Sequence, residues 1–266
     1  MANDPGRSRE FLKYMVSPFL RDILRYLQSQ IKFALNRKVL RRNQLWRNRY
    51  LNEEVIVVGN GPSLRHMDPA DLLNRHVIVM NNFYRAAWAN TITPVATCFG
   101  EPPNSPAWED PTPIFEMTSS ISYWLHIDNI KRGGPLPFDE RFSYVLPGIE
   151  PKLFRQSEIR LDRPSVGYQN TGILAIEVAL YMGFKSIKLI GFDHDWLASP
   201  EFSRHFYSDE KDATDMLGRL SYLELIKSAE RTWEGYYAMN RASKSHGARI
   251  VNCSTHSFLD VFDRGV

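Results

Sequence analysis

Short apolar runs alternate with segments of helical periodicity along most of the chain. The runs are rich in β-branched residues and lie at residues 55–58, 76–80, 94–99, 186–190 and 248–252. Apolar runs of this length, bounded by turn residues, are typical of strands buried on both faces of a sheet. Because strands that alternate with helices form parallel sheets, we predict an α/β fold with a mainly parallel sheet flanked by helices.

Helices are expected between and after these strands. They are predicted at residues 68–73, 171–183, 216–246 and 257–262. Asp68 is the expected N-cap of the first, and Gly183 and Gly247 end the second and the third. The third is one long helix or two short ones. The proline-rich segment that follows residue 102 predicts turns and extended chain instead.

The first fifty residues are predicted to form a basic amphipathic helical arm. From residue 11 to 35, apolar residues recur at Leu12, Val16, Phe19, Ile23, Leu27, Ile31 and Ala34. This spacing of three and four places them on one stripe of a helix, which Pro18 is expected to begin or kink. We therefore divide the chain into an arm at 1–50 and an α/β domain at 51–266.

Charge separates the arm from the rest of the chain. Residues 1–50 contain 12 of the 33 Lys and Arg residues but only 3 of the 30 Asp and Glu residues, so a basic arm precedes an acidic body. Basic residues cluster near Trp46 and Tyr50, at Arg37, Lys38, Arg41, Arg42, Arg47 and Arg49. Cations interleaved with aromatic rings suit an anionic membrane surface, and we predict that contact for residues 11–50.

A docked helix is the alternative for the arm, because the same pattern fits a helix packed on the body or on a second subunit of a homo-oligomer. Nucleic acid is a weaker partner, since nothing downstream resembles a reading module. No apolar run reaches the length of a membrane span, and no signal-peptide core is evident. Cys98 and Cys253 are the only cysteines, which favours a reducing compartment. The predicted location is cytoplasmic and peripheral at the inner face of the membrane.

Polar residues collect where the predicted strands end. Gly59, Asn60, Gly61 and Ser63 follow the first strand, Asn81 and Asn82 the second, Asp193 and Asp195 a later one, and Asn252 and Ser254 the last. Amides, hydroxyls and a glycine turn at one edge of a sheet suit a nucleotide with its ribose and phosphates. The turn is neither a Walker loop nor a GxGxxG fingerprint, because Leu64 replaces the third glycine.

Three of these segments resemble known families. They are residues 59–64 (Gly-Asn-Gly-Pro-Ser-Leu), residues 81–84 (Asn-Asn-Phe-Tyr), and the stretch from Thr171-Gly172 to Gly191-Phe192-Asp193. Together they resemble the bacterial family 42 sialyltransferases and the related DUF115 group, which includes motility-accessory glycosyltransferases and hydroxymethylpterin pyrophosphokinases. The likeness covers the chain from residue 55 onward and leaves the arm outside it.

The resemblance implies a Rossmann-like sheet and a glycosyltransferase that moves a sugar, such as a sialic-acid-like sugar from a CMP donor, to a surface-glycan acceptor. The donor-binding residues would be Gly59, Asn60, Gly61, Ser63, Asn81, Asn82, Thr171, Gly172, Asp193, Asp195, Asn252 and Ser254. By the same resemblance His205 would be the general base, and Tyr207 would donate to the leaving phosphate in place of a metal. The chain departs from the sialyltransferases at Asp195 and Trp196, where they carry tyrosines, and at Tyr168, where they carry an arginine.

Two other functions stay open from the residues alone. Asp193 and Asp195 have the spacing of an Asp-x-Asp pair, which would bind Mg²⁺ on a diphosphate in a pyrophosphokinase that uses ATP. The alternative for this pair is that Asp193 caps its own loop and Asp195 faces solvent, so no metal site is firmly predicted. The third hypothesis is a non-catalytic nucleotide-binding protein.

Overall fold

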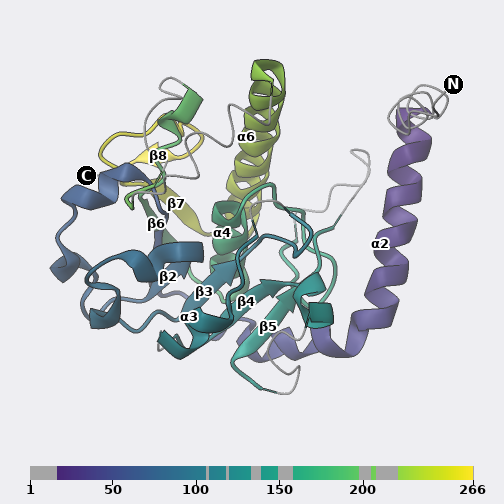
Figure 1. The fold of residues 1–266 in the computed structure, drawn as a ribbon, viewed down its shortest axis with the longest axis horizontal. Helices are drawn as coiled ribbons and strands as arrows, with labels where there is room; N and C mark the ends of the chain where they lie inside the picture. Colours follow the sequence, from purple (N-terminus) through teal and green to yellow (C-terminus); the bar gives the residue numbers. More distant parts are fainter. Residues whose placement is uncertain are drawn as a thin grey trace, which may run out of the picture.

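The computed structural model describes residues 17–105, 108–117, 120–132, 139–148, 158–197, 205–207 and 221–265. In these residues the chain forms one eight-stranded sheet in which every neighbouring pair is parallel (Figure 1). The strands are β1 (Glu54–Val58), β2 (Val77–Met80), β3 (Ala96–Phe99), β4 (Tyr123–His126), β5 (Phe142–Val145), β6 (Ser186–Ile190), β7 (Arg249–Asn252) and β8 (Asp263–Arg264). The predicted α/β fold with a parallel sheet is confirmed.

The strand order reverses its direction at the middle of the sheet. It runs β5-β4-β3-β2-β1-β6-β7-β8, so the chain builds outward from β1 on one side and then returns to add β6 on the other. Such a reversal is a topological switch point, the place where open parallel sheets commonly bind ligands. The loops after β1 and β6 are therefore the ones that frame the candidate site.

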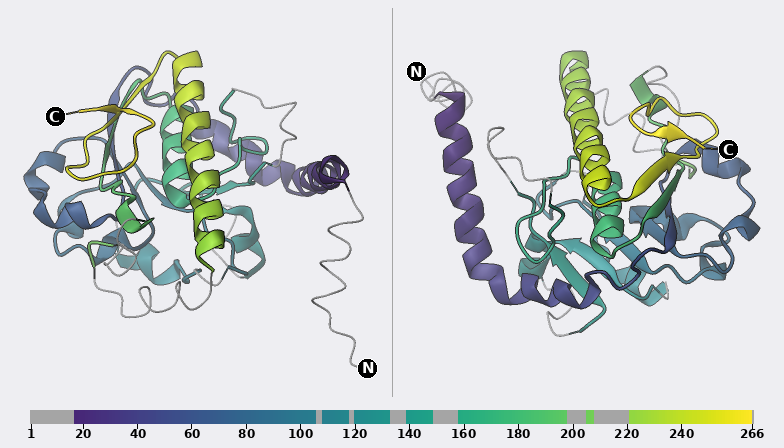
Figure 2. Two further views of the ribbon diagram at one scale, coloured as in Figure 1. Left: turned by 90° about the horizontal axis from the view of Figure 1, so that it is seen from above. Right: turned by 180° about the vertical axis from the view of Figure 1, so that it is seen from behind.

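Two of the α-helices cover one face of this sheet, and residues of the other two pack with β3, β4 and β5 on its opposite face. The α-helices of the described residues are α2 (Pro18–Arg41), α3 (Thr112–Met117), α4 (Thr171–Tyr181) and α6 (Tyr222–Ser245). α4 packs over β1, β2 and β3, and α6 lies outside it against β7 (Figure 2). Every residue of α4 is buried, which agrees with its almost wholly apolar sequence. Asn170 caps its first turn by accepting from the Ile173 amide at 2.9 Å, and Gly183 follows its end with φ of +95°.

Short 3-10 turns cover the central strands on the opposite face. They are η2 (Pro62–His66), η3 (Pro69–Leu72), η4 (Asn81–Arg85) and η5 (Ala89–Thr91). Their apolar residues, including Leu64, Leu72 and Phe83, form a second cluster on β1 and β2. The helix predicted at 68–73 is therefore a single 3-10 turn. Asp68 caps it as expected, by accepting from the Ala70 amide at 2.9 Å.

One prediction about secondary structure is wrong, and two strands are missing from the predicted set. Residues 257–262 form no helix, because the Ser257 hydroxyl donates to the Phe192 carbonyl and accepts from the Leu259 amide, which holds the segment as an irregular loop. The predicted strands omit β4 and β5, which follow the proline-rich segment; that segment has a turn at residues 103–104 and the start of α3 at Thr112. These strands are aromatic and buried, and the rings of Tyr123 and Phe142 stack at 5.2 Å between centroids.

Pro18 was expected to begin or to kink the helix, and α2 begins there. The Ser17 side chain caps α2 by accepting a hydrogen bond from the Leu20 amide. Leu12 and Val16 of the predicted stripe lie outside the described residues. Within the part of the chain that the structure describes, no helix is both long and apolar enough to span a bilayer.

The end of the predicted arm packs into the body, although the proposed boundary lies at residue 50. Leu40 and Trp46 are buried, and the Asn43 amide donates to the carbonyls of Tyr144 and Leu161 at 2.8 and 2.6 Å. The Tyr50 ring stacks on Phe184 with centroids 4.9 Å apart. Trp46 belongs to the core, so the expectation that its ring sits at a membrane interface is wrong, and the partly buried Tyr50 packs against the core.

A carboxyl group lies buried in α4 beneath the central strands. The Glu177 side chain is fully buried, and its Oε1 accepts from the Val166 amide at 2.9 Å. Burial raises the pKa of this carboxyl from 4.5 to about 7, and hydrogen bonds from Val166 and Ser165 oppose the shift. The folded protein therefore holds a proton here that the unfolded chain releases at lower pH.

Glu177 makes stability depend on pH. Below pH 4.5 both states are protonated. Between pH 4.5 and 7 only the unfolded state releases the proton, so the free energy of unfolding should fall by roughly 3 kcal/mol as pH rises through this window. We expect Glu177→Gln to remove this slope in denaturant titrations at pH 5 and pH 8, whereas the exposed Glu230→Gln should keep it. A wild-type slope retained in Glu177→Gln would contradict the assignment.

Candidate functional site

The turns that follow β1 and β6 pack backbone against backbone. The Gly59 amide donates to the Ile190 carbonyl at 2.8 Å, and the Gly61 amide donates to the Gly191 carbonyl at 2.9 Å. A Cβ atom at Gly59 would lie 2.3 Å from the Gly191 oxygen, and one at Gly61 would lie 2.7 Å from it. Both positions therefore require glycine for the close approach of two loops.

Ser63 and Asp193 clamp the same two turns together. The Ser63 amide donates to Asp193 Oδ2 at 2.7 Å, and its hydroxyl donates to Oδ1 at 2.5 Å. Asp193 is only 3% exposed, and this burial raises its pKa while the two bonds from Ser63 favour the ionised form. The amides of Gly59, Gly61 and Ser63 are all used inside the protein, so they do not form a cradle for a phosphate.

The bonds between Ser63 and Asp193 also affect whether the Asp193–Asp195 pair could bind a metal ion. Both oxygens of Asp193 already accept hydrogen bonds from Ser63, so it acts as the loop cap that was the alternative interpretation. Asp195 begins the short turn η8 (Asp195–Leu197) and is partly exposed. In the described part of the chain, no group of three His, Cys, Asp or Glu side chains is arranged to hold a metal ion.

Asn252 and Ser254 also serve the scaffold. The Asn252 amide nitrogen donates to Ser257 Oγ and to the Leu259 carbonyl, each at 3.0 Å, and its Oδ1 accepts from the Ser254 amide. The Ser254 hydroxyl accepts from the Phe192 amide at 2.9 Å. These bonds join the loop after β7 to the loop after β6, and both side chains are buried.

The predicted residues at the start of α4 are buried as well. Thr171 Oγ1 accepts from the Gly100 amide at 3.3 Å. A Cβ atom at Gly172 would lie 2.9 Å from the Tyr236 hydroxyl, so glycine allows α6 to approach α4. The Tyr236 hydroxyl in turn bonds His194 Nε2 at 2.8 Å, and burial lowers the pKa of His194 to about 4. A neutral His194 thus links the loop after β6 to α6.

Other predicted residues gather around the segment 205–207. The Phe206 amide donates to the Asn60 carbonyl at 2.9 Å, which seats this segment on the end of β1. The Asn82 amide donates to the Tyr207 hydroxyl at 3.5 Å, and the rings of His205 and Tyr207 stack 4.9 Å apart with an angle of 14° between their planes. His205 and Tyr207 are both partly exposed. The structure therefore brings the expected base and its tyrosine together at the ends of β1 and β2.

The side chain of Asn60 has one atom that bonds within the protein and one that accepts no bond from the described residues. Its side-chain nitrogen donates to the Met80 carbonyl at 3.2 Å, which ties the end of β1 to the end of β2. Its Oδ1 is buried and accepts no hydrogen bond from the residues that the structure describes. A buried oxygen without a donor costs free energy, so this atom is a candidate partner for a ligand donor.

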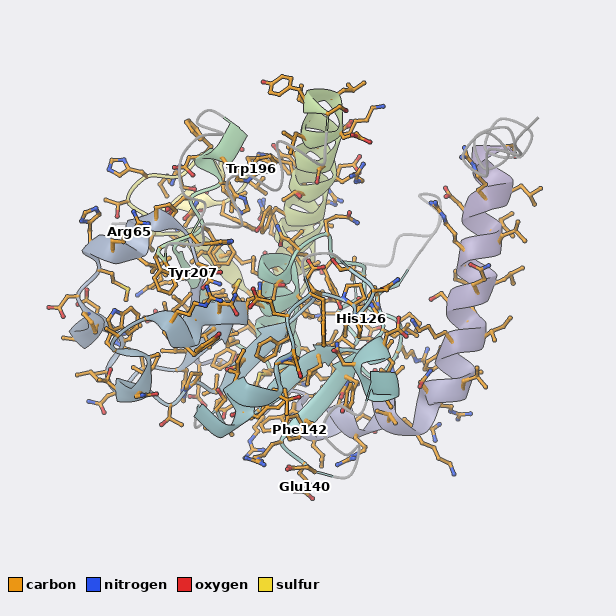
Figure 3. All side chains as sticks on the ribbon, in the orientation of Figure 1. Arg65, His126, Glu140, Phe142, Trp196 and Tyr207 are labelled. Carbon is orange, nitrogen blue, oxygen red and sulfur yellow. The ribbon has the colours of Figure 1, made fainter. Side chains whose placement is uncertain are left out.

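Two arginines join this group, and the sequence analysis did not include them. Arg65 donates from Nε to the Phe206 carbonyl at 2.8 Å and from Nη2 to the His205 carbonyl at 3.1 Å. The Arg85 guanidinium lies 4.8 Å from the centre of the Tyr207 ring and 3.7 Å from a Glu109 carboxylate oxygen. Arg65 and Tyr207 are labelled near each other in Figure 3. Arg85 directly follows residues 81–84, so its place beside that motif was an available signal.

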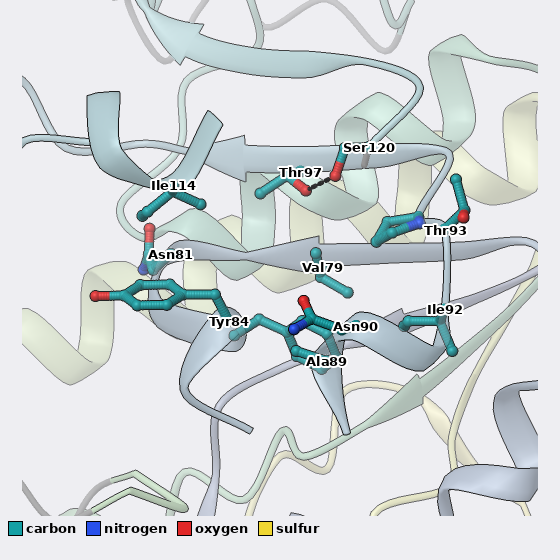
Figure 4. Close-up of a pocket in the computed structure, with 12 residues that line it drawn as sticks. Val79, Asn81, Tyr84, Ala89, Asn90, Ile92, Thr93, Thr97, Ile114 and Ser120 are labelled. Atoms are coloured by element: carbon teal, nitrogen blue, oxygen red, sulfur yellow. Dashed lines mark hydrogen bonds between the residues drawn. The ribbon is translucent and has the colours of Figure 1, made fainter. Parts of the chain in front are cut away.

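A cavity of about 250 Å³ lies beside this group, on the sheet face that carries the 3-10 turns (Figure 4). Val79 and Thr97 form its floor, and Asn81, Tyr84 and Ile114 line its walls. Asn81 adopts φ of +45°, a conformation that asparagine tolerates better than most residues. Asn81 therefore lines this cavity, while Asn82, its neighbour, contacts Tyr207.

Comparisons with known proteins give structural likeness only. No family model matches the chain, and no curated protein matches it. The sialyltransferase CstII from Campylobacter jejuni in complex with CMP-3FNeuAc matches with 15% identity and a TM-score of 0.47, covering 80% of this chain and 86% of that one. Its complex with a trisaccharide acceptor and CMP matches with 16% identity and a TM-score of 0.45, covering 80% and 85%.

A second type of protein is similar to the same degree. The MAf glycosyltransferase from Magnetospirillum magneticum AMB-1 matches with 17% identity and a TM-score of 0.44, over 86% of this chain. This chain spans 38% of the length of that protein. We therefore argue the chemistry of the site from the residues of this chain.

The clamp between Ser63 and Asp193 should contribute to stability. Ser63→Ala removes a short bond to a buried carboxylate, and we expect the free energy of unfolding to fall by about 2 kcal/mol in a urea titration. The matched control is Ser186→Ala, whose hydroxyl donates to the half-exposed Glu54 at 3.0 Å and should matter less. Equal losses for the two variants would show that the clamp is no stronger than a surface contact.

Proposed function

We propose that this protein is a glycosyltransferase that moves a sugar from a nucleotide donor to a glycan acceptor. The donor would be a CMP-linked, sialic-acid-like sugar and the acceptor a surface glycan. Support comes from the motif at residues 59–64, which resembles that of the family 42 sialyltransferases, and from the residues that gather at the switch point of the sheet.

One observation carries the proposal: an imidazole, a phenol and a guanidinium meet at the ends of β1 and β2. They belong to His205, Tyr207 and Arg85, and Arg85 is distant in sequence from the other two. Transfer to a hydroxyl needs a base near neutral pH that removes the acceptor proton, and histidine suits that task. It also needs positive or donor groups for the negative charge that develops on the leaving phosphate.

In this proposal His205 is the base, and Tyr207 with Arg85 stabilises the leaving phosphate. Arg85 can donate to phosphate oxygens through its planar guanidinium, a geometry that favours bidentate binding. Its contact with the Tyr207 ring holds both groups at one place. Asn60 Oδ1 and the Asn82 side chain, on the neighbouring strand ends, would contact the nucleotide.

The pyrophosphokinase alternative fits these residues less well. It needs Mg²⁺ on a diphosphate, and Asp193 is 3% exposed with both of its oxygens already bonded to Ser63. The charge on the donor phosphate is therefore assigned to protein side chains.

The proposal also includes the location and partners expected from the sequence. The protein would act in the cytoplasm, peripherally at the inner face of the membrane, with the arm within residues 11–50 toward the lipid. A homo-oligomer is the alternative use of the arm. No contact with nucleic acid is proposed.

Nucleotide binding tests the donor assignment. In calorimetric titrations with CMP, UDP, GDP and ATP, each with magnesium and with EDTA, we expect CMP to bind equally well in both. Arg85→Gln should weaken CMP binding about tenfold, because it removes a charged partner of the phosphate. Arg75→Gln is the matched control, since Arg75 pairs with Glu54 before β2, away from the site. Binding of ATP alone, and only with magnesium, would favour the pyrophosphokinase.

Transfer tests the role of His205. With CMP-sialic acid and a galactose-terminated oligosaccharide, we expect His205→Gln to lower kcat by roughly a factor of 100 to 10,000, the usual contribution of a general base. Its affinity for CMP should change little. The exposed His256→Gln is the control and should transfer normally. Unchanged transfer by His205→Gln would remove it as the base, and CMP binding without any transfer by the wild type would favour the non-catalytic hypothesis.

A further inference from the structure

α2 has two different sides, and only one of them contacts the body. On the inner side Leu40 is buried, Phe33 packs against the cluster on β4 and β5, and Lys32 Nζ donates to Asp128 at 2.7 Å. Figures 1 and 2 show the helix beside the β5 end of the sheet, with its other side turned outward. The helix is therefore already held in place without its outer side.

The outer side of α2 is apolar and exposed. Its residues are Leu20, Leu24, Leu27, Ile31 and Leu35, which are between 48% and 81% exposed. Their spacing of four, three, four and four places them on one narrow stripe, about 22 Å long. We name these five residues the outer stripe. Leu27 and Ile31 belong to the stripe that the sequence predicts. Because both side chains are exposed, they do not dock α2 on the body.

Basic residues surround the outer stripe. α2 contains six Lys and Arg residues, of which Lys32 faces the body, and one acidic residue, Asp22, which lies 3.9 Å from Arg25. Arg25, Arg37 and Lys38 are exposed. A helix with an apolar stripe and a basic border has the character of helices that lie in the plane of a membrane interface.

Charge decides between the two occupants that an apolar stripe could have. If a second copy paired along the outer stripe, the basic residues of the two α2 helices would lie close together. Like charges that lie close together repel. An anionic bilayer accepts the apolar residues among its acyl chains and the cations among its headgroups. The helix is too polar to cross the bilayer, so it would lie along the surface.

We propose that the outer stripe of α2 binds the surface of an anionic lipid bilayer, with the basic residues around it on the headgroups. This inference rests on α2 alone and does not depend on the reaction that the protein catalyses. It names a face of the helix and excludes Trp46, which lies in the core, and Tyr50, which packs against the core.

Co-sedimentation of the full chain with vesicles tests the proposal. The vesicles would be phosphatidylcholine alone, or an equal mixture of phosphatidylcholine and phosphatidylglycerol. We expect binding to the anionic vesicles only, and weaker binding as salt is added. The double variant L27Q/I31Q should lower the partition coefficient more than tenfold, and R37Q/K38Q about tenfold.

A matched control separates the outer stripe from general surface hydrophobicity. L223Q/I226Q changes two apolar residues of α6 that are 59% and 45% exposed, close to the values of 50% and 62% at Leu27 and Ile31. It should bind vesicles like the wild type, and all variants should keep the wild-type melting temperature because the side chains are exposed.

Three outcomes would overturn the proposal. They are failure of the wild type to bind anionic vesicles, an equal loss in the α6 control, and a dimer in light scattering that L27Q/I31Q converts to monomer while vesicle binding is unchanged. The last result would assign the stripe to a second copy. Because none of these measurements uses a nucleotide, failure here is distinct from failure of the proposed transferase activity.

Discussion

The close approach of the turns after β1 and β6 is the constraint on which the candidate site depends. Gly59 and Gly61 let the two backbones touch, and the carboxylate of Asp193 then holds Ser63 by two short bonds. This contact fixes the end of β1, where the Asn60 carbonyl receives the Phe206 amide. That bond holds the segment with His205 and Tyr207 at the end of β1. The positions of these two residues therefore depend on the packing of the two glycine turns.

Much of the central fold could be predicted from the sequence, because buried parallel strands are short apolar runs and α4 is apolar on all sides. β4 and β5 could not, since prolines nearby indicate turns and both strands are aromatic rather than β-branched. Residues 257–262 were predicted as a helix because their sequence, which begins with Ser257, is compatible with a short helix. Its hydroxyl bonds to Phe192, a residue that is distant in sequence, and no local pattern reveals such a bond.

The structure shows where the predicted site residues lie and which of them bond to one another. Polar residues at strand ends do converge, as parallel topology requires. The sequence shows which residues carry donors and acceptors, but not which of them satisfy each other. Ser63 with Asp193, and Asn252 with Ser254, were assigned to a ligand and instead bond within the scaffold. The same reasoning passed over Arg85, whose importance arises only from its contact with the Tyr207 ring.

The N-terminal arm joins the chemistry of the sheet to the surface of the molecule. Its last turn is part of the core, through Leu40, Asn43 and the Tyr50 ring on Phe184, and Lys32 pairs with Asp128 further along the helix. A helix anchored at several points cannot rotate its outer stripe independently of the sheet. Whatever surface binds that stripe therefore acquires a fixed orientation relative to the ends of β1 and β2. An enzyme whose acceptor is held on a membrane gains from this arrangement, because orientation replaces a search that free diffusion would require.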